Sequence, residues 1–226
     1  MGYEFSEEVA FLVVGDPLCA TTHTDMMIRA RDFGVEVKVI HNASVMGAIA
    51  GCGLQLYSFG LTVSIPFFDE KWRPDSFYDK IGSNRVGKMH TLALLDIKVK
   101  EPDYEAMMKG RTQFLPPRYM TVSTAVAQLL EIEGRRQEGH CLPSSLGVGM
   151  ARLGQPTQQI AFGTLEELLE ADLGGPLHCL VLCTGDLHDL EMQFMAPFRV
   201  GNGATTNDTT EPPPAVSAAE EQPGNV

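Results

Sequence analysis

The residues with the clearest chemical potential lie at three places where an apolar, strand-like run of the chain comes to an end. Asp16 follows the first run, Ser44 follows the second, and Leu95 and Asp96 close a later one. Ligands of doubly wound α/β sheets bind beyond the carboxyl ends of the strands, so a small molecule would lie near these residues. A carboxylate such as that of Asp16 accepts hydrogen bonds from a ribose or an amine. The sequence therefore indicates an α/β protein with a small-ligand site.

Several of these residues also have a purely structural interpretation. Asp16 precedes Pro17 in a composition typical of a turn, and local spacing alone favours the turn over ligand binding. Ser44 is a natural N-cap for a helix expected over residues 45–56. His178 begins an apolar run, where a histidine packed in the core is more common than a catalytic one. Local patterns leave both interpretations open, and they assign no catalytic residue.

Sequence motifs of several large enzyme classes are missing from the chain. It has no G-x-G-x-x-G fingerprint and no P-loop, so neither NAD nor ATP is implied. It has neither a G-x-S-x-G nucleophile elbow nor an H-E-x-x-H zinc motif. The five cysteines are never paired as C-x-x-C, which favours reduced thiols over a disulfide framework or a metal site. We therefore expect no bound metal.

The composition is that of a globular, acidic protein. With 44% hydrophobic residues among 226, the chain can bury a substantial core. Its formal net charge of −12 would repel phosphate backbones and anionic membranes, so we expect neither nucleic acid nor a membrane as a partner. No apolar run is long enough to cross a bilayer, and the start lacks the basic stretch of a signal peptide. These features, with the reduced cysteines, favour a cytoplasmic protein.

Hydrophobic periodicity predicts alternating strands and helices. Residues 9–14 are apolar on both faces, which predicts a buried parallel strand, and a helix over residues 24–33 leads to a second strand over residues 35–40. Further strands are predicted at residues 61–68, 91–99, 146–153 and 177–184, and further helices at residues 45–56, 101–108, 119–132 and 165–171.

This order of elements favours two small α/β domains. We expect an N-terminal α/β domain over residues 1–96 and a C-terminal α/β domain over residues 97–200. The last stretch, residues 201–226, is rich in Pro, Gly, Thr and Ala and contains little apolar surface to offset its ordering entropy. A disordered tail is therefore predicted there.

Longer stretches of the chain resemble the diphthine synthase family. In chain order they are FLVVGDPLCATTHTD, VKVIHNASVMGAIAGCGLQLYSFG, KWRPDSFYDKI, MHTLALLDIKVKE, PPRYM and DLGGPLHCLV. The family belongs to the tetrapyrrole-methylase-like methyltransferases, so the resemblance implies two α/β domains with S-adenosyl-L-methionine in the cleft between them. It also implies methylation of the modified histidine of translation elongation factor 2 in diphthamide biosynthesis, which yields diphthine methyl ester.

The same resemblance implies a set of cofactor contacts. The aspartate of the family's GDP turn falls on Asp16, and a glycine two positions after the proline falls on Cys19. The adjacent pair in the HNAS turn falls on Ser44 and Val45. Asp16 and His178 can contribute side chains, whereas the apolar positions would act through their backbone. The remaining positions are Leu95 in LLD, Leu153 after AR and His178 in PLH.

Two features depart from the family pattern. Cys19 replaces a glycine, and its Cβ and sulfur would crowd a cofactor that approaches the backbone. The family also begins with an apolar strand and a GLGLGD-type loop ahead of the segment aligned with Val9. We therefore expect a truncated N-terminal domain with an exposed sheet edge.

Two functional hypotheses follow from the sequence. The first is a methyltransferase on elongation factor 2; methyl transfer from a sulfonium mainly requires alignment of the reacting atoms, so no strong base need stand out. His178 as a proton acceptor is the weaker interpretation beside a role in holding the cofactor. The second hypothesis is a truncated, non-catalytic relative that no longer binds the cofactor and acts at most as a binding protein. Family members often form dimers, which leaves a homodimer open.

Overall fold

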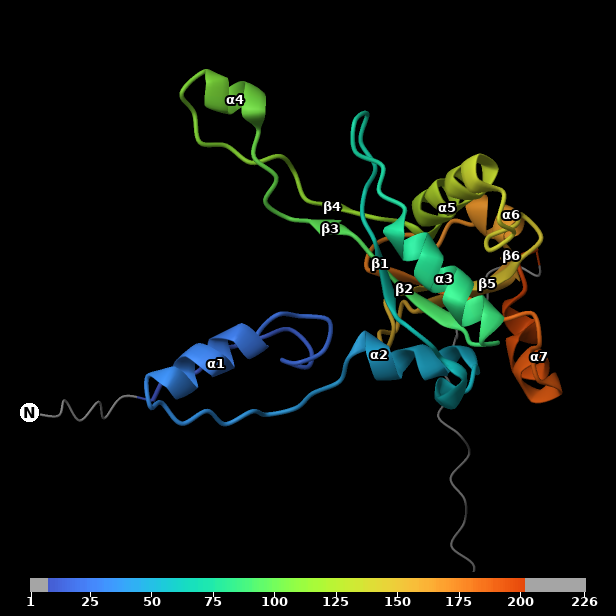
Figure 1. The fold of residues 1–226 in the computed structure, drawn as a ribbon, viewed down its shortest axis with the longest axis horizontal. Helices are drawn as coiled ribbons and strands as arrows, with labels where there is room; N and C mark the ends of the chain where they lie inside the picture. Colours follow the sequence, from blue (N-terminus) through green and yellow to red (C-terminus); the bar gives the residue numbers. More distant parts are fainter. Residues whose placement is uncertain (1–7, 202–226) are drawn as a thin grey trace, which may run out of the picture.

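A five-stranded mixed sheet forms the centre of the structure, a computed structural model that describes residues 8–201 (Figure 1). The first strand pair, β1 with β2, is parallel, and the other three neighbouring pairs are antiparallel. The α/β class is therefore confirmed. The predicted tail, apart from Gly201, lies outside the described residues. In sheet order the strands are β1 (Val63–Ile65), β2 (Thr91–Leu95), β7 (His178–Leu182), β5 (Leu146–Ala151) and β6 (Gln159–Thr164).

Helices lie on both faces of this sheet. The α-helices are α1 (Thr24–Asp32), α2 (Val45–Ala48), α3 (Ser76–Val86), α4 (Tyr104–Met108), α5 (Val122–Arg136), α6 (Leu165–Leu169) and α7 (Asp189–Met195), and the 3-10 turns are η1 (Ile49–Cys52), η2 (Leu56–Ser58) and η3 (Ala196–Phe198). The helix α3 connects the parallel strands β1 and β2, because a parallel pair cannot be joined by a tight turn.

Alternate residues of the central strands belong to two separate cores. In β7, Leu180 belongs to the core under α3, α5 and α6, whereas Val181 belongs to the core under η1 and α7. Ala93 and Leu92 of β2 divide in the same way. This follows from the two-residue period of a strand, whose successive side chains point to opposite faces. Both faces of the central strands are therefore buried.

The amino-terminal segment does not join the sheet. Residues 9–14 and 35–40 form no strand, so the predictions of strands at both places are wrong. Leu12 and Val14 are 90% and 101% exposed, and within residues 8–48 only Asp16 is buried. A strand requires a hydrogen-bonded neighbour, and neither run pairs with any described strand. Figure 1 shows α1 and the extended segment after it lying apart from the sheet.

Several helix ends follow directly from sequence signals. Thr164 is the N-cap of α6 and forms a capping box, with its hydroxyl accepting from the Glu167 N–H and the Glu167 carboxylate accepting from the Thr164 N–H. Thr121 caps α5 by accepting from the Thr124 N–H at 3.1 Å. Gly34 ends α1 with a φ of +72°, a conformation that glycine adopts at little cost.

The predicted domain division near residue 96 stays a prediction. The strand β2 ends at Leu95, and it pairs with β7 through Leu92–Val181 and Ala93–Leu180, so the sheet contains strands from both sides of that position. Between β2 and α5 the chain forms an arm that projects from the sheet and carries α4 (Figure 1). The base of the arm is an antiparallel pair, β3 (Ile97–Lys98) with β4 (Arg118–Tyr119).

Candidate functional site

Three of the residues assigned by resemblance converge at one end of the sheet. Leu95 is the last residue of β2, His178 is the first of β7, and Leu153 lies two residues beyond the end of β5. The strand pairs Leu94–Cys179 and Ala151–His178 fix these positions relative to one another. We call this end, where β2 and β5 finish and β7 begins, the site edge.

His178 is held by backbone groups on both sides of its ring. Its Nδ1 accepts a hydrogen bond from the Val122 N–H at 3.3 Å, at the first residue of α5. Its Nε2 lies 3.0 Å from the carbonyl oxygens of both Gly174 and Gly175. Since Nδ1 accepts from an N–H and Nε2 faces carbonyls, Nε2 carries the proton of a neutral ring. The side chain thus links α5 to residues 172–177, the loop that precedes β7.

The site edge combines apolar side chains with open backbone. Leu95 is buried beneath the edge and Leu153 is half-buried. At Gly154 and Gly175, a Cβ atom would meet nothing within 4 Å, so the backbone there faces open space. Apolar side chains beside open space of this kind are typical of small-molecule sites.

Asp16 and the segment around Ser44 form a second group. The Asp16 carboxylate accepts from the Leu18 N–H at 2.8 Å, from His41 Nδ1 at 2.9 Å and from the Asn42 N–H at 3.1 Å. These hydrogen bonds, in that order of importance, hold the pKa of Asp16 well below its usual range. Asp16 is therefore both a turn residue and the link between residues 15–19 and 41–44.

The other members of the second group make fewer contacts. The N–H of Cys19 donates to the Asp16 carbonyl at 3.4 Å, and its thiol is half-exposed. Ser44 lies at the N-cap of α2 as predicted, but its hydroxyl makes no capping hydrogen bond and the helix ends at Ala48. Val45 packs against the core that also contains Ile49.

The two groups are separate in this structure. Within residues 8–201, every hydrogen bond made by residues 8–43 stays inside residues 8–43. Val45 joins this segment to the body of the molecule, since Val45 and Leu153 pack against the same core. Asp16 and Cys19 are thus not joined by any such bond to Leu95 or His178.

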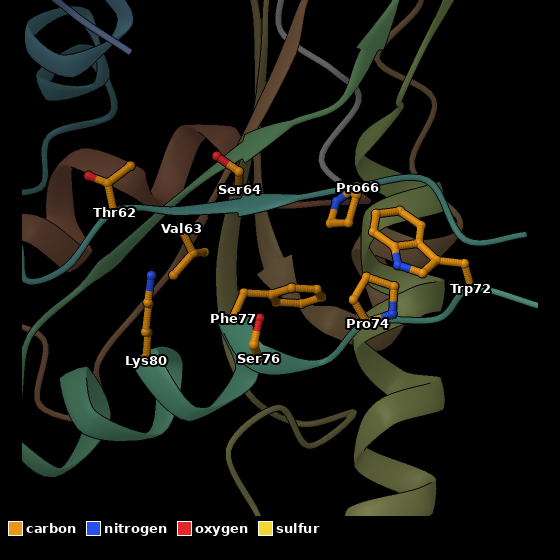
Figure 2. A pocket seen from close by; sticks show the side chains of 9 residues that line it. All are labelled: Thr62, Val63, Ser64, Pro66, Trp72, Pro74, Ser76, Phe77 and Lys80. Atoms are coloured by element: carbon orange, nitrogen blue, oxygen red, sulfur yellow. The ribbon is translucent and has the colours of Figure 1, made fainter. Parts of the chain in front are cut away.

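A cavity of about 320 Å³ lies at a different place, along the outer edge of β1 (Figure 2). Side chains from β1, including Val63, face side chains from α3, including Phe77 and Lys80. Trp72 and Pro74, from the connecting loop, close one end. None of the residues assigned to the cofactor lines this cavity, so it is distinct from the site edge.

Arg152 is a residue of the site edge that sequence reasoning missed. Its side chain donates to carbonyl oxygens of the loops on both sides of it, at Thr157 and Leu173. The resemblance drew attention to Leu153 next to it and not to the arginine. The available signal was a long cation at the end of an apolar strand, directly before a glycine turn at Gly154. Within the described residues, no three His, Cys, Asp or Glu side chains gather as metal ligands.

Comparison with known proteins places this fold in one class. Residues 4–169 match the family model of the Tetrapyrrole (Corrin/Porphyrin) Methylases. A crystal structure from Entamoeba histolytica, assigned as a diphthine synthase, superposes with a TM-score of 0.74 at 46% identity, covering 82% of this chain and 68% of that one.

Curated relatives narrow the class. Diphthine methyl ester synthase 2 of Candida albicans is 57% identical over 192 residues, which are 85% of this chain and 64% of that protein. Diphthine methyl ester synthase of Dictyostelium discoideum is 54% identical over 193 residues, 85% of this chain and 70% of that protein. The chain therefore belongs to the diphthine methyl ester synthase family, within the tetrapyrrole methylases.

The match covers part of the relatives' length. The chain spans 64% of the Candida albicans protein. In the part of the chain that the structure describes, no helix combines the length and the apolar character needed to cross a bilayer.

Proposed function

We propose that this chain is a methyltransferase that uses S-adenosyl-L-methionine to methylate the modified histidine of translation elongation factor 2 in diphthamide biosynthesis. The observation that carries this proposal is the 57% identity over 192 residues with a protein named diphthine methyl ester synthase. The convergence of Leu95, Leu153 and His178 at the site edge supports it, because these positions come from β2, from the turn after β5 and from β7. The cytoplasm, where translation takes place, is the expected location.

The site edge fits such a cofactor by the chemistry of its groups. An adenine ring packs against apolar side chains, and the half-buried Leu153 beside the open space at Gly154 offers such a contact. At Gly175, across the edge, a Cβ atom would also meet nothing within 4 Å, which leaves a second open space. When bound, S-adenosyl-L-methionine supplies a methyl group on a positively charged sulfur, which is a good leaving group.

The residues of the chain would act by binding and orientation. Transfer of a methyl group to an amine or a carboxylate depends chiefly on holding the acceptor, the methyl carbon and the sulfur in line. Both ring nitrogens of His178 are already hydrogen-bonded to backbone groups, so we infer that His178 shapes the site and does not accept a proton. Asp16 stays ionised and would reach the cofactor only with residues 8–43 brought to the site edge.

A transfer assay tests the proposal. Purified chain is incubated with methyl-labelled S-adenosyl-L-methionine and elongation factor 2 that carries the unmethylated diphthamide intermediate. We expect label on the factor and no label on factor that carries an ordinary histidine, since the acceptor groups belong to the added side chain. Absence of label on both forms would contradict the proposal and favour a non-catalytic relative. The predicted homodimer stays a prediction, which sedimentation of the purified chain decides.

A further inference from the structure

Arg152 connects the two loops that border the site edge. Its Nε donates to the Thr157 carbonyl at 2.9 Å and lies 3.1 Å from the Thr157 hydroxyl, in the turn after β5. Its Nη1 donates to the Leu173 carbonyl at 2.9 Å and to the Gly175 carbonyl, both in the loop 172–177 before β7. The Arg152 N–H donates to the Leu177 carbonyl at 2.9 Å. A single residue thus binds two loops on opposite sides of the edge, whose nearest bonded residues, Thr157 and Leu173, lie 16 positions apart in the chain.

The backbone of Arg152 adopts an uncommon conformation. Its φ is +50°, in the left-handed region that favours glycine, and Gly154 follows at +78°. Residues other than glycine occupy this region at a cost, and they persist there when surrounding contacts hold them. The contacts at Thr157, Leu173 and Gly175 are of that kind. A strained residue next to an assigned cofactor position is a reason to look for a role in the site.

His178 binds the same loop from the other side. Its Nε2 lies 3.0 Å from the Gly175 carbonyl, which also accepts from Arg152. Its Nδ1 accepts from Val122, so the loop is connected through His178 to the start of α5. The loop 172–177 is therefore held between a side chain from β5's end and a side chain from β7's start.

We propose that Arg152 is a positioning residue of the cofactor site: it fixes the loop 172–177 so that the backbone near Gly175 and the ring of His178 face the site edge in one arrangement. It acts through the loop and does not contact reacting atoms. The proposal rests on the proposed function for the identity of the ligand. An arginine is needed because its planar guanidinium donates in several fixed directions, whereas a lysine keeps the charge as a single point.

The first experiment requires no ligand. Amide hydrogen exchange, followed by mass spectrometry, is compared between the wild-type chain and Arg152→Lys for peptides that cover residues 153–158 and 172–178. We expect exchange in the second peptide to rise about tenfold, with exchange in α5 unchanged. Arg85→Lys is the matched control, because Arg85 also donates to a backbone carbonyl, that of His140, away from the site edge. Unchanged exchange in Arg152→Lys would overturn the proposal.

The second experiment adds the cofactor. Calorimetric titration with S-adenosyl-L-methionine should show at least tenfold weaker affinity for Arg152→Lys and unchanged affinity for Arg85→Lys. In the transfer assay, the KM for the cofactor should rise while kcat changes less than threefold. Thr157→Val removes one acceptor only and should give a smaller loss, which keeps the test valid where Arg152→Lys folds poorly.

The outcomes separate the two proposals. Raised exchange with unchanged affinity would overturn the positioning role while leaving the proposed function standing. A wild-type chain without affinity for S-adenosyl-L-methionine would overturn the proposed function and the assignment of the ligand. The exchange result then decides by itself whether Arg152 fixes the loop.

Discussion

Arg152 and His178 share one acceptor: the carbonyl oxygen of Gly175 receives a hydrogen bond from the guanidinium and another, at 3.0 Å, from the imidazole. The two donors come from the end of β5 and the start of β7, which are neighbours in the sheet. A carbonyl oxygen has two lone pairs, so both bonds can form at once. The loop before β7 is therefore held by side chains from two neighbouring strand ends, and these hydrogen bonds fix the shape of the site edge.

Removal of the imidazole should destabilise the chain. In His178→Ala the Val122 N–H and the Gly174 carbonyl lose their protein partner. A buried N–H such as that of Val122 left without a partner costs about 1–3 kcal/mol of unfolding free energy, whereas the exposed Gly174 carbonyl can bond to water. Urea denaturation measures the change. His178→Gln, whose amide both donates and accepts, should recover part of it; a His178→Ala chain as stable as the wild type would show that the ring is dispensable.

Glu133 should make the stability of the chain depend on pH in the acid range. Its carboxylate accepts from the Tyr78 hydroxyl and from the N–H groups of Cys141 and Gly139. Burial alone would raise its pKa, but these bonds outweigh it and place the pKa below the ordinary 4.5. A carboxyl group with a lowered pKa stabilises the fold above its unfolded value, and the effect is lost as the pH falls through the folded value.

The matched pair for this prediction is Glu133→Gln and Glu131→Gln. Glu131 is an exposed neighbour on α5 that pairs with Arg73. We expect Glu133→Gln to lose about 1 kcal/mol of unfolding free energy at pH 7 and to flatten its decline below pH 5. Glu131→Gln should change by less than about 0.5 kcal/mol, as exposed ion pairs do. Equal pH profiles for wild type and Glu133→Gln would refute the role given to Glu133.

Trypsin should cut first in the amino-terminal segment. Lys38 lies in residues 35–43, which contain no helix or strand and no buried side chain. Segments with few buried contacts open at almost no cost in free energy. Mass spectrometry of early digests should find cuts at or before Lys38, while Lys80 and Arg85 in α3 remain intact. Early cuts in α3 with Lys38 protected would mean that residues 8–43 pack on the body.

Thiol labelling should distinguish one cysteine from the other four. Cys19 is half-exposed, whereas Cys52, Cys141, Cys179 and Cys183 are buried. Burial raises the pKa of the Cys141 and Cys179 thiols to about 12, so little reactive thiolate forms near neutral pH. We expect one rapid modification of the native chain at pH 8 and five in urea. Rapid modification of two or more thiols in the native chain would contradict the buried core.

Local signals predicted the carboxyl-terminal half better than the amino-terminal half. The predictions of a strand at β5 and a helix at α5 are confirmed, because each element buries its apolar face against neighbours that are present. Residues 9–14 have an equally apolar pattern but lie beside no described strand, so the same pattern gives an exposed run. A pattern indicates what a segment can bury; whether a partner exists depends on the rest of the fold.

The helix α3 was missed because polar residues interrupt its apolar pattern. Asn84 is fully buried, and its amide donates to the Leu61 carbonyl at 2.8 Å and to the Thr91 hydroxyl at 2.9 Å. Such a residue looks exposed in a sequence, although its hydrogen bonds make burial favourable. The strand β6 and the helix α7 were also not predicted.

The candidate site was predictable in part. The resemblance gave Leu95, Leu153 and His178, and the structure shows that they meet at one edge. Arg152 stands out in the sequence as a long cation at a strand end, but its role was not predictable, because that role depends on the carbonyl of Leu173, 21 positions further along the chain. Contacts of this length arise from folding and leave no local pattern.

Titration of the wild-type chain with S-adenosyl-L-methionine in a calorimeter tests the central claim most directly. The claim is that a member of the diphthine methyl ester synthase family with this site edge binds the cofactor of a methyltransferase. We predict saturable binding with about one cofactor per chain, weakened at least tenfold in Arg152→Lys. No heat of binding up to millimolar cofactor would contradict the claim.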